Sequence, residues 1–174
     1  MRIAISSKSG CGNTTVSKLV AEKLGCKMIN FTFRQMAEER GVDFRQFCQI
    51  AEGDDSIDKE LDRRQVEMAM AEEDCVLGSR LAIWMLEEAD LKVYLKASEK
   101  TRAERVLKRE GGSFADKYKE TKERDEHDSA RYERIYGINN NDYDKIADIV
   151  IDTDYRRPEE IADLIIKEAA QKKR

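Results

Sequence analysis

The chain has 174 residues, 39% of them charged, and a formal net charge of −4 at pH 7. This length predicts one domain with its own core, and the acidic balance argues against a general nucleic-acid binder, which would carry a basic excess. No apolar run approaches the length of a membrane-spanning helix, and the chain starts on a strand-like segment instead of a signal peptide. The 4 cysteines are scattered without a C-x-x-C pair, which is typical of reduced thiols, so we expect a cytoplasmic protein.

A β-branched strand is predicted over residues 2–6, and it runs through a loop of small residues straight into a helix. Compared with the phosphate-binding pattern G-x-x-x-x-G-K-[ST], the loop has Ser7 at the first glycine, Gly12 at the second, Asn13 at the lysine and Thr14 at the last position. Its glycines let the backbone N–H groups point inward, and the helix N-terminus adds partial positive charge. We therefore predict phosphate binding by Ser7, Lys8, Ser9, Gly10, Cys11, Gly12, Asn13, Thr14 and Thr15.

Asn13 replaces the lysine that normally reaches the β- and γ-phosphates in such loops. Lys8 can supply a cation from another direction, and the Thr14 hydroxyl stands where a magnesium ion needs a ligand. Cys11 is either a thiol with a pKa lowered by the helix N-terminus or a small residue that fills the loop, and the second interpretation is favoured. The alternative for the whole segment is an ordinary strand-to-helix turn whose glycines serve geometry alone.

The rest of the chain alternates between short apolar strands and amphipathic helices, which predicts an α/β fold with a parallel five-stranded sheet covered on both faces. After the first strand we expect a helix from Val16 to Leu24 stopped by Gly25, a strand over 27–30, and a helix containing Phe33 and Met36. A short helix capped by Asp43, a long helix capped by Asp55 or Ser56, a strand over 75–77, a short helix over 81–88 and a strand over 91–95 should follow. The last predicted elements are a helix capped by Ser98, a charged helix over 113–136, a strand over 148–152 and a helix from Pro158.

Ligands bind beyond the carboxyl ends of the strands in sheets of this kind. The residues that directly follow each strand should therefore form the site. They are 7–15, 30–34, 78–80, 96–98 and 153–157.

Arginines recur at helical spacing in the second half of the chain, on either side of Gly111 and Gly112. Two such helices can form a hinged flap whose guanidinium groups meet the oxyanions of a phosphoryl group and exclude water. The alternative is a solvated helix pair with surface ion pairs. The residues are Arg102, Arg105 and Arg109 on the first helix and Arg124, Asp128 and Arg131 on the second.

Several segments together resemble the cytidylate kinases of the short type that is common in archaea. The resemblance spans nearly the whole chain, and it implies a three-layer P-loop NTPase fold with a helical lid. The segments that carry it are 3–15, 30–34, 57–65, 79–85, 102–105, 124–132, 136–138 and 149–154.

The resemblance implies transfer of the γ-phosphate of ATP to CMP or dCMP, with Mg²⁺ held by Thr14. It also implies a role for each residue that matches the family pattern, and it places residues 154–157 near the adenine. The roles are CMP binding by Arg34, Arg63, Arg80 and Asp128, with Arg34 on the monophosphate and Asp128 on the ribose, and catalysis by Arg124 and Arg131. Arg105 and Arg109 would be lid arginines on the helix that enters the flap. From the loop itself we add Lys8 as a third catalytic candidate, because it can supply a cation there.

As a member of that family the chain would be a monomeric, single-domain kinase without nucleic-acid or membrane partners. Its core would comprise residues 1–30, 73–110 and 145–174, with a monophosphate-binding helical segment over 31–72 and a lid over 111–144.

Two positions depart from the expected pattern: Asn13 stands where phosphate loops carry lysine and where the shorter relatives often carry threonine, and Gly78 stands where the family tends to place an acidic residue that helps hold magnesium. Two alternative functions therefore stay open. One is a P-loop kinase for another small-molecule acceptor, and the other is a catalytically impaired nucleotide-binding protein.

Overall fold

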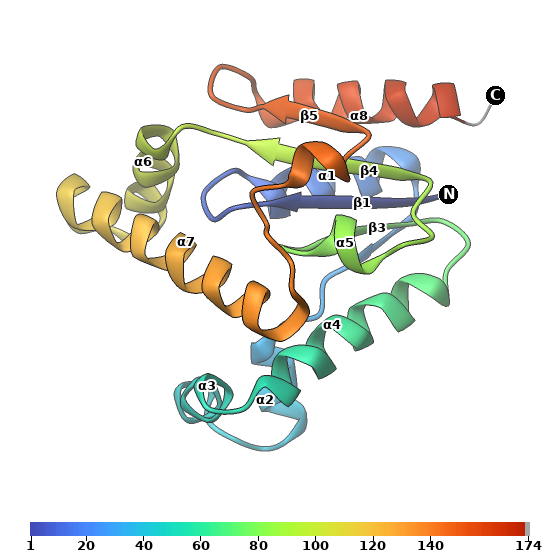
Figure 1. Ribbon diagram of the computed structural model, residues 1–174. Helices are drawn as coiled ribbons and strands as arrows, with labels where there is room; N and C mark the ends of the chain where they lie inside the picture. The colour runs from blue at the N-terminus through green and yellow to red at the C-terminus, as the bar shows by residue number, and fades with distance from the viewer. Residues whose placement is uncertain (173–174) are drawn as a thin grey trace.

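The computed structural model, which describes residues 1–172, is built on a five-stranded parallel sheet in the order β2-β3-β1-β4-β5 (Figure 1). β1 is central, and its Ile5 lies opposite Gly78 of β3 and Val93 of β4. The loop after β1 therefore lies at the middle of the carboxyl edge, so the predicted α/β fold is confirmed. The strands are β1 (Arg2–Ser7), β2 (Lys27–Ile29), β3 (Cys75–Gly78), β4 (Leu91–Lys96) and β5 (Ile149–Asp152).

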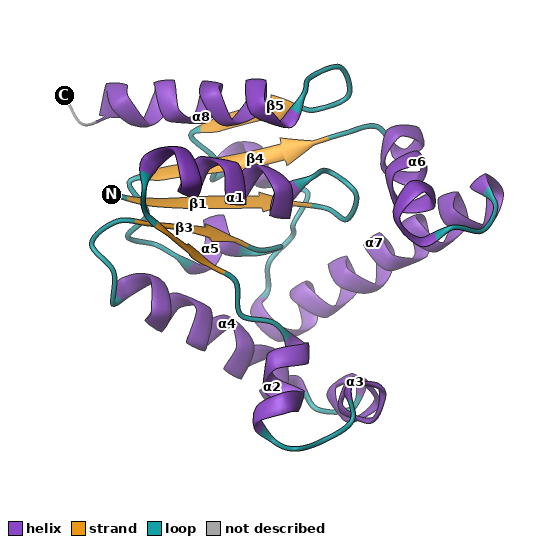
Figure 2. Cartoon of the chain, turned by 180° about the vertical axis from the view of Figure 1, so that it is seen from behind, coloured by secondary structure: helices purple, strands orange, loops and turns teal. Residues whose placement is uncertain are grey.

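Helices cover both faces of the sheet because its strands are apolar on both sides. Along β1, Ile3 and Ile5 join the core under α1 (Asn13–Leu24) and α8 (Pro158–Lys172), the helices that lie in front of the sheet in Figure 2. Ala4 points the other way and packs with residues of α4 (Asp55–Met70) and α5 (Ala82–Met85). This alternation holds β1, and the loop that follows it, rigidly between two cores.

A third, smaller core lies outside the sheet, among three helices. It joins α2 (Phe33–Glu39), α3 (Phe44–Glu52) and α4 through Met36, Phe47 and Ile57, all of them at most 2% exposed. The N-terminal half of α4 thereby packs with α2 and α3, while its C-terminal half packs on the sheet through Ala69.

Two helices extend past the carboxyl ends of the strands (Figure 1). These are α6 (Glu99–Glu110), capped by Ser98, and α7 (Phe114–Tyr136), capped by Ser113. Gly111 and Gly112, with φ of 76° and 99°, make the turn between them, a conformation that L-residues with a Cβ rarely adopt. The chain returns to β5 through a short 3-10 helix, η1 (Tyr143–Lys145).

Most element boundaries follow the sequence pattern, and the differences have local causes. Asp54 caps α4, in place of the predicted Asp55 or Ser56, because its carboxylate accepts a hydrogen bond from the Ser56 backbone N–H at 2.9 Å. The helix predicted over 81–88 is shorter, since Leu86 with ψ of 80° leaves the helical region. The division into core, helical segment and lid stays a prediction, and residues 173–174 of its core lie outside the described residues.

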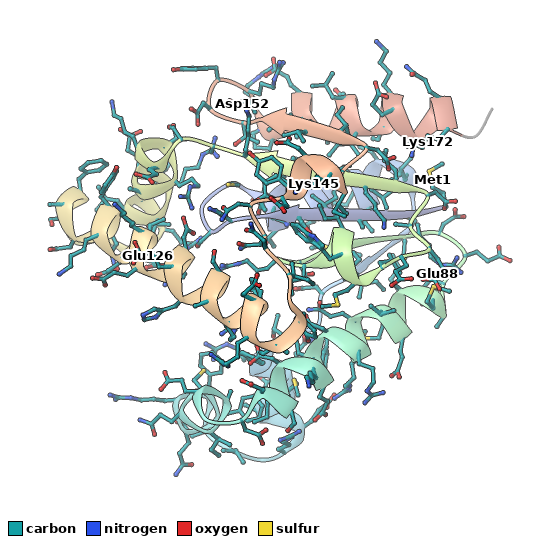
Figure 3. All side chains as sticks on the ribbon, viewed as in Figure 1. Met1, Glu88, Glu126, Lys145, Asp152 and Lys172 are labelled. Atoms are coloured by element: carbon teal, nitrogen blue, oxygen red, sulfur yellow. The ribbon has the colours of Figure 1, made fainter. Side chains whose placement is uncertain are left out.

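Met1 and Lys172 lie at the amino end of the sheet, away from α6 and α7 (Figure 3). Lys172 forms an ion pair there with Asp148 at 2.6 Å, just before β5. Within the described chain we find no helix whose length and apolar character would let it span a membrane.

The contact between the loop after β1 and α6 should be sensitive to a single methyl group. Gly10 has φ of 80°, and a Cβ there would lie 2.8 Å from the Arg102 carbonyl oxygen. Gly25 has φ of 65° with nothing within 4 Å of its Cβ position, so Gly25→Ala reports the backbone cost alone. We expect Gly10→Ala to lower the free energy of unfolding by at least about 1 kcal/mol more than Gly25→Ala in urea denaturation. Equal losses would contradict the close contact.

Candidate active site

A cavity of about 850 Å³ opens at the carboxyl edge of the sheet, within the size range of small-molecule sites. Residues 7–16 of the phosphate loop and α1 form its floor, and α4, α6 and α7 contribute its walls. The segments predicted after β1, β2, β3 and β5 all contribute to it. The predicted segment 96–98 does not belong to its described lining, because Ser98 is used there to cap α6.

The loop after β1 presents backbone N–H groups to this cavity. Gly10 and Gly12, with φ of 80° and 86°, turn the chain, and α1 starts directly after Gly12. No side chain among residues 1–172 caps this N-terminus, so its first amides stay available to an anion. Cys11 is 2% exposed in the core, and burial raises the pKa of its thiol to about 11, which supports the interpretation of a small filling residue.

The Asn13 side chain turns back toward the sheet. Its amide nitrogen donates to the Ile5 carbonyl oxygen at 3.0 Å and to the Ser79 carbonyl oxygen at 3.4 Å, while its oxygen accepts from the Ser17 hydroxyl at 2.9 Å. Asn13 therefore links α1 to β1 and to the end of β3.

The predicted lid residues of α7 face the cavity together. Arg124 donates to the Ser9 hydroxyl at 3.3 Å, and Asp128 forms ion pairs with Arg80 and, at 3.3 Å, with Arg131. These four charged residues all line the cavity. Cations from the loop after β3 and from α7 are thus gathered around one carboxylate, an arrangement that oxyanions of a phosphate can join.

Arg102 and Arg105 hold α6 against the phosphate loop. The Arg102 guanidinium, 4% exposed as a residue, forms a two-point ion pair with Asp125 of α7 at 2.6 and 3.1 Å and donates to the Ser9 carbonyl oxygen. Arg105 donates to the Gly10 and Thr153 carbonyl oxygens. Arg105 and Arg109 line the cavity, whereas the Arg102 side chain is used in contacts that hold α6, α7 and the phosphate loop together.

Sequence reasoning missed an acidic face of α4. Asp58, Asp62 and Gln65 recur at helical spacing and line the cavity, which is the pattern that could have revealed them. Asp62 accepts from the Tyr136 hydroxyl at 2.6 Å, and burial raises its pKa to about 6. Asp58 lies 3.4 Å from the Arg131 Nε atom, which has no hydrogen-bond partner of good geometry in the described residues.

The described lining of this cavity does not include Arg34 and Arg63, so their contact with CMP stays a prediction. Arg63 lies on the outer face of α4, away from Asp62, and pairs with Glu67. Arg63 follows Asp62 by about 100° of helix rotation, and its side chain is 60% exposed. Arg34 is exposed and stacks its guanidinium 4.1 Å from the ring centre of Phe44.

Magnesium would find one protein ligand of the expected kind in the phosphate loop. Thr14 is exposed and lines the cavity beside the α1 N-terminus. No cluster of three His, Cys, Asp or Glu residues suited to a metal occurs in the part of the chain that the structure describes. Thr14 therefore fits a Mg²⁺ ion that takes most of its ligands from water and from substrate phosphate oxygens.

A parallel sheet, a phosphate loop entering α1 and an arginine-bearing helix over one cavity define the class of P-loop kinases. The shikimate kinase of Acinetobacter baumannii has a similar fold, with a TM-score of 0.68 over 99% of this chain and 94% of that one, at 16% identity.

Residues 2–155 match the model of the cytidylate kinase-like family, and the chain belongs to that family. It is 45% identical over 168 residues to cytidylate kinase 2 of Borreliella burgdorferi, covering 95% of this chain and 93% of that protein. It is 38% identical over 175 residues to the cytidylate kinase of Archaeoglobus fulgidus, covering 99% and 97%. The family resemblance predicted from the sequence is confirmed.

The raised pKa of Asp62 predicts a pH-dependent stability. Because its folded pKa, about 6, exceeds the ordinary value of 3.8, the folded state binds its proton more tightly, and stability from this group is lost as pH rises from about 4 to about 6. We expect Asp62→Asn to gain on the order of 2 kcal/mol over wild type between pH 4 and pH 7, measured by urea unfolding.

Asp54 gives a control of opposite sign. Its hydrogen bonds to Ser56 hold its pKa below the ordinary value, so its contribution is lost as pH falls, and Asp54→Asn should destabilise the protein more at pH 7 than at pH 4. A pH-independent difference between Asp62→Asn and wild type would contradict the raised pKa.

Proposed function

We propose that this protein transfers the γ-phosphate of ATP to CMP or dCMP and yields ADP with CDP or dCDP. The observation that carries the proposal is the convergence of the phosphate loop and the α7 arginines on one cavity, in a chain that belongs to the cytidylate kinase-like family. The family membership favours this function over a P-loop kinase for another acceptor and over an impaired nucleotide-binding protein.

The cavity has separate regions that suit a donor and an acceptor nucleotide. The phosphate loop and α1 N-terminus suit the triphosphate, and Arg156 lines the cavity where residues 154–157 are expected to meet the adenine. Arg80 and Arg131 suit the acceptor monophosphate because a guanidinium binds two phosphate oxygens at once. Asp128 joins both arginines and suits the ribose hydroxyls.

The acidic face of α4 supports a cytosine base. Asp58 and Asp62 line the cavity beside Phe31, and a carboxylate oxygen accepts hydrogen bonds but donates none when ionised. Cytosine offers an exocyclic amine to such an acceptor, whereas uracil offers a carbonyl oxygen at the same position. The Tyr136 hydrogen bond uses part of the accepting capacity of Asp62 and leaves room for a further donor.

The residues of this chain would act by position and charge, as phosphoryl transfer requires little covalent chemistry from the protein. The loop amides and the arginines of α7 would hold the phosphates in line and stabilise the charge that develops on the transferred group. Mg²⁺, held by Thr14 and phosphate oxygens, would supply further positive charge. Helices α6 and α7 would exclude water over the cavity.

The test is ADP formation from Mg-ATP with CMP, dCMP, UMP, AMP and GMP offered one at a time. We expect turnover with CMP and dCMP far above that with the other three. Turnover with none of them, in protein that binds ATP, would contradict the proposal.

Arg124 provides a direct test of the lid. Arg124 is exposed and donates a hydrogen bond to the neutral Ser9 hydroxyl, so its removal leaves no buried carboxylate unpaired. We expect Arg124→Ala to lower kcat by about 100-fold or more, with the midpoint of thermal unfolding unchanged. Lys119→Ala, which removes a cation from a 77% exposed position on the same helix, is the matched control and should keep wild-type turnover. Equal turnover in both variants would contradict a catalytic role for α7.

A further inference from the structure

Asn13 stands where phosphate loops usually carry lysine, and the structure shows which groups its side chain contacts. All the polar atoms of the Asn13 side chain bond within the fold, to Ile5, Ser79 and Ser17. Ser17 is fully buried, and the two carbonyl oxygens belong to β1 and to the segment after β3. Asn13 therefore stabilises the fold, and its amide nitrogen points toward main-chain oxygens instead of toward a ligand.

Gly78 belongs to the same arrangement. A Cβ at this position would lie 2.4 Å from the Ser17 hydroxyl oxygen and 2.7 Å from the Asn13 amide oxygen. Real Cβ atoms do not approach other atoms so closely, so no carboxylate fits at position 78 while the Asn13–Ser17 hydrogen bond exists. A side chain at position 78 would therefore displace Ser17 and Asn13, so Gly78 and the Asn13–Ser17 hydrogen bond depend on each other.

The charge that the loop lacks at position 13 is present at position 8. Lys8 is half-buried and lines the cavity, and its ammonium donates to the Asn141 amide oxygen at 2.8 Å. This acceptor is neutral, so it keeps the ammonium in place without cancelling its charge. Lysine is a flexible point charge that can leave such an acceptor for a phosphate oxygen at low cost.

Arg124 reaches the loop from α7 through the Ser9 hydroxyl, and two other arginines near the loop are committed elsewhere. Arg102 is paired with Asp125, and Arg105 is bonded to Thr153 and to the Gly10 carbonyl oxygen. Within the loop itself, residues 7–15, Lys8 is the only cationic residue.

We propose that Lys8 supplies the cation that binds the β- and γ-phosphates of ATP, while Asn13, Ser17 and Gly78 form a neutral clamp that fastens α1 to the sheet. The inference rests on the proposed use of ATP by this site. In this arrangement the Lys8 ammonium provides the positive charge of a loop lysine, and the Asn13 amide provides the hydrogen bonds that fasten α1 to the sheet.

The experiment measures Mg-ATP binding by calorimetry without any acceptor, and turnover with CMP, for wild type, Lys8→Met and Lys18→Met. Lys18 is 69% exposed on α1 and is the matched control. We expect Lys8→Met to weaken ATP binding by about tenfold or more and to lower kcat by about 100-fold, with an unchanged unfolding midpoint and with Lys18→Met like wild type. Wild-type binding and turnover in Lys8→Met would overturn the proposal.

Position 13 is tested by Asn13→Lys and Asn13→Ala. We expect both to lower the unfolding midpoint by several degrees, because the bonds to Ile5, Ser79 and Ser17 are lost, and we expect no gain in turnover from Asn13→Lys. A tenfold or greater gain in Asn13→Lys would overturn the proposal, since it would mean that the loop lacks a cation.

The two readouts separate this inference from the proposed function. If wild type transfers phosphate to none of the acceptors but Lys8→Met still weakens ATP binding, the proposed acceptor is wrong and the role of Lys8 stands. If wild type turns over CMP and Lys8→Met matches it, the function stands and the role of Lys8 is wrong.

Discussion

The buried ion pair between Arg102 and Asp125 joins three parts of the molecule that form the cavity. Arg102 lies on α6, Asp125 on α7, and the same guanidinium reaches the Ser9 carbonyl oxygen in the phosphate loop. Removing one member of such a pair leaves an uncompensated buried charge, which costs about 3–5 kcal/mol. The pair therefore fixes the rotation of α7 about its axis, and with it the direction of Arg124, one residue earlier, toward the loop.

Arg80 and Arg131, which we propose bind the acceptor phosphate, have carboxylate partners in the structure. Asp128 pairs with Arg80 and Arg131, and Asp58 lies against Arg131. A substrate phosphate would enter this set and share the guanidinium groups, while Asp128 turns to a hydroxyl donor. Asp58 and Asp128 therefore partly neutralise Arg80 and Arg131, and they hold these arginines in position instead of leaving them to move in solvent.

The sequence predicted the sheet, the phosphate loop and the two arginine helices because each of these rests on a local pattern. The rotation of α4 about its axis was harder to predict: Asp58, which the sequence analysis did not single out, lines the cavity, whereas Arg63 pairs with Glu67 outside the described lining. The direction of Asn13 could not be predicted, since it depends on carbonyl oxygens of Ile5 and Ser79 that only the folded sheet brings together.

If the proposed function is correct, a triphosphate on the loop and a monophosphate under α7 occupy one cavity at the same time. The most direct measurement is the affinity for a bisubstrate compound in which adenosine and cytidine are joined through their 5′ positions by five phosphates. We expect this compound to bind at least about 100-fold more tightly than ATP or CMP alone, since its second half binds as part of one molecule. Affinity no greater than that of ATP alone would contradict it.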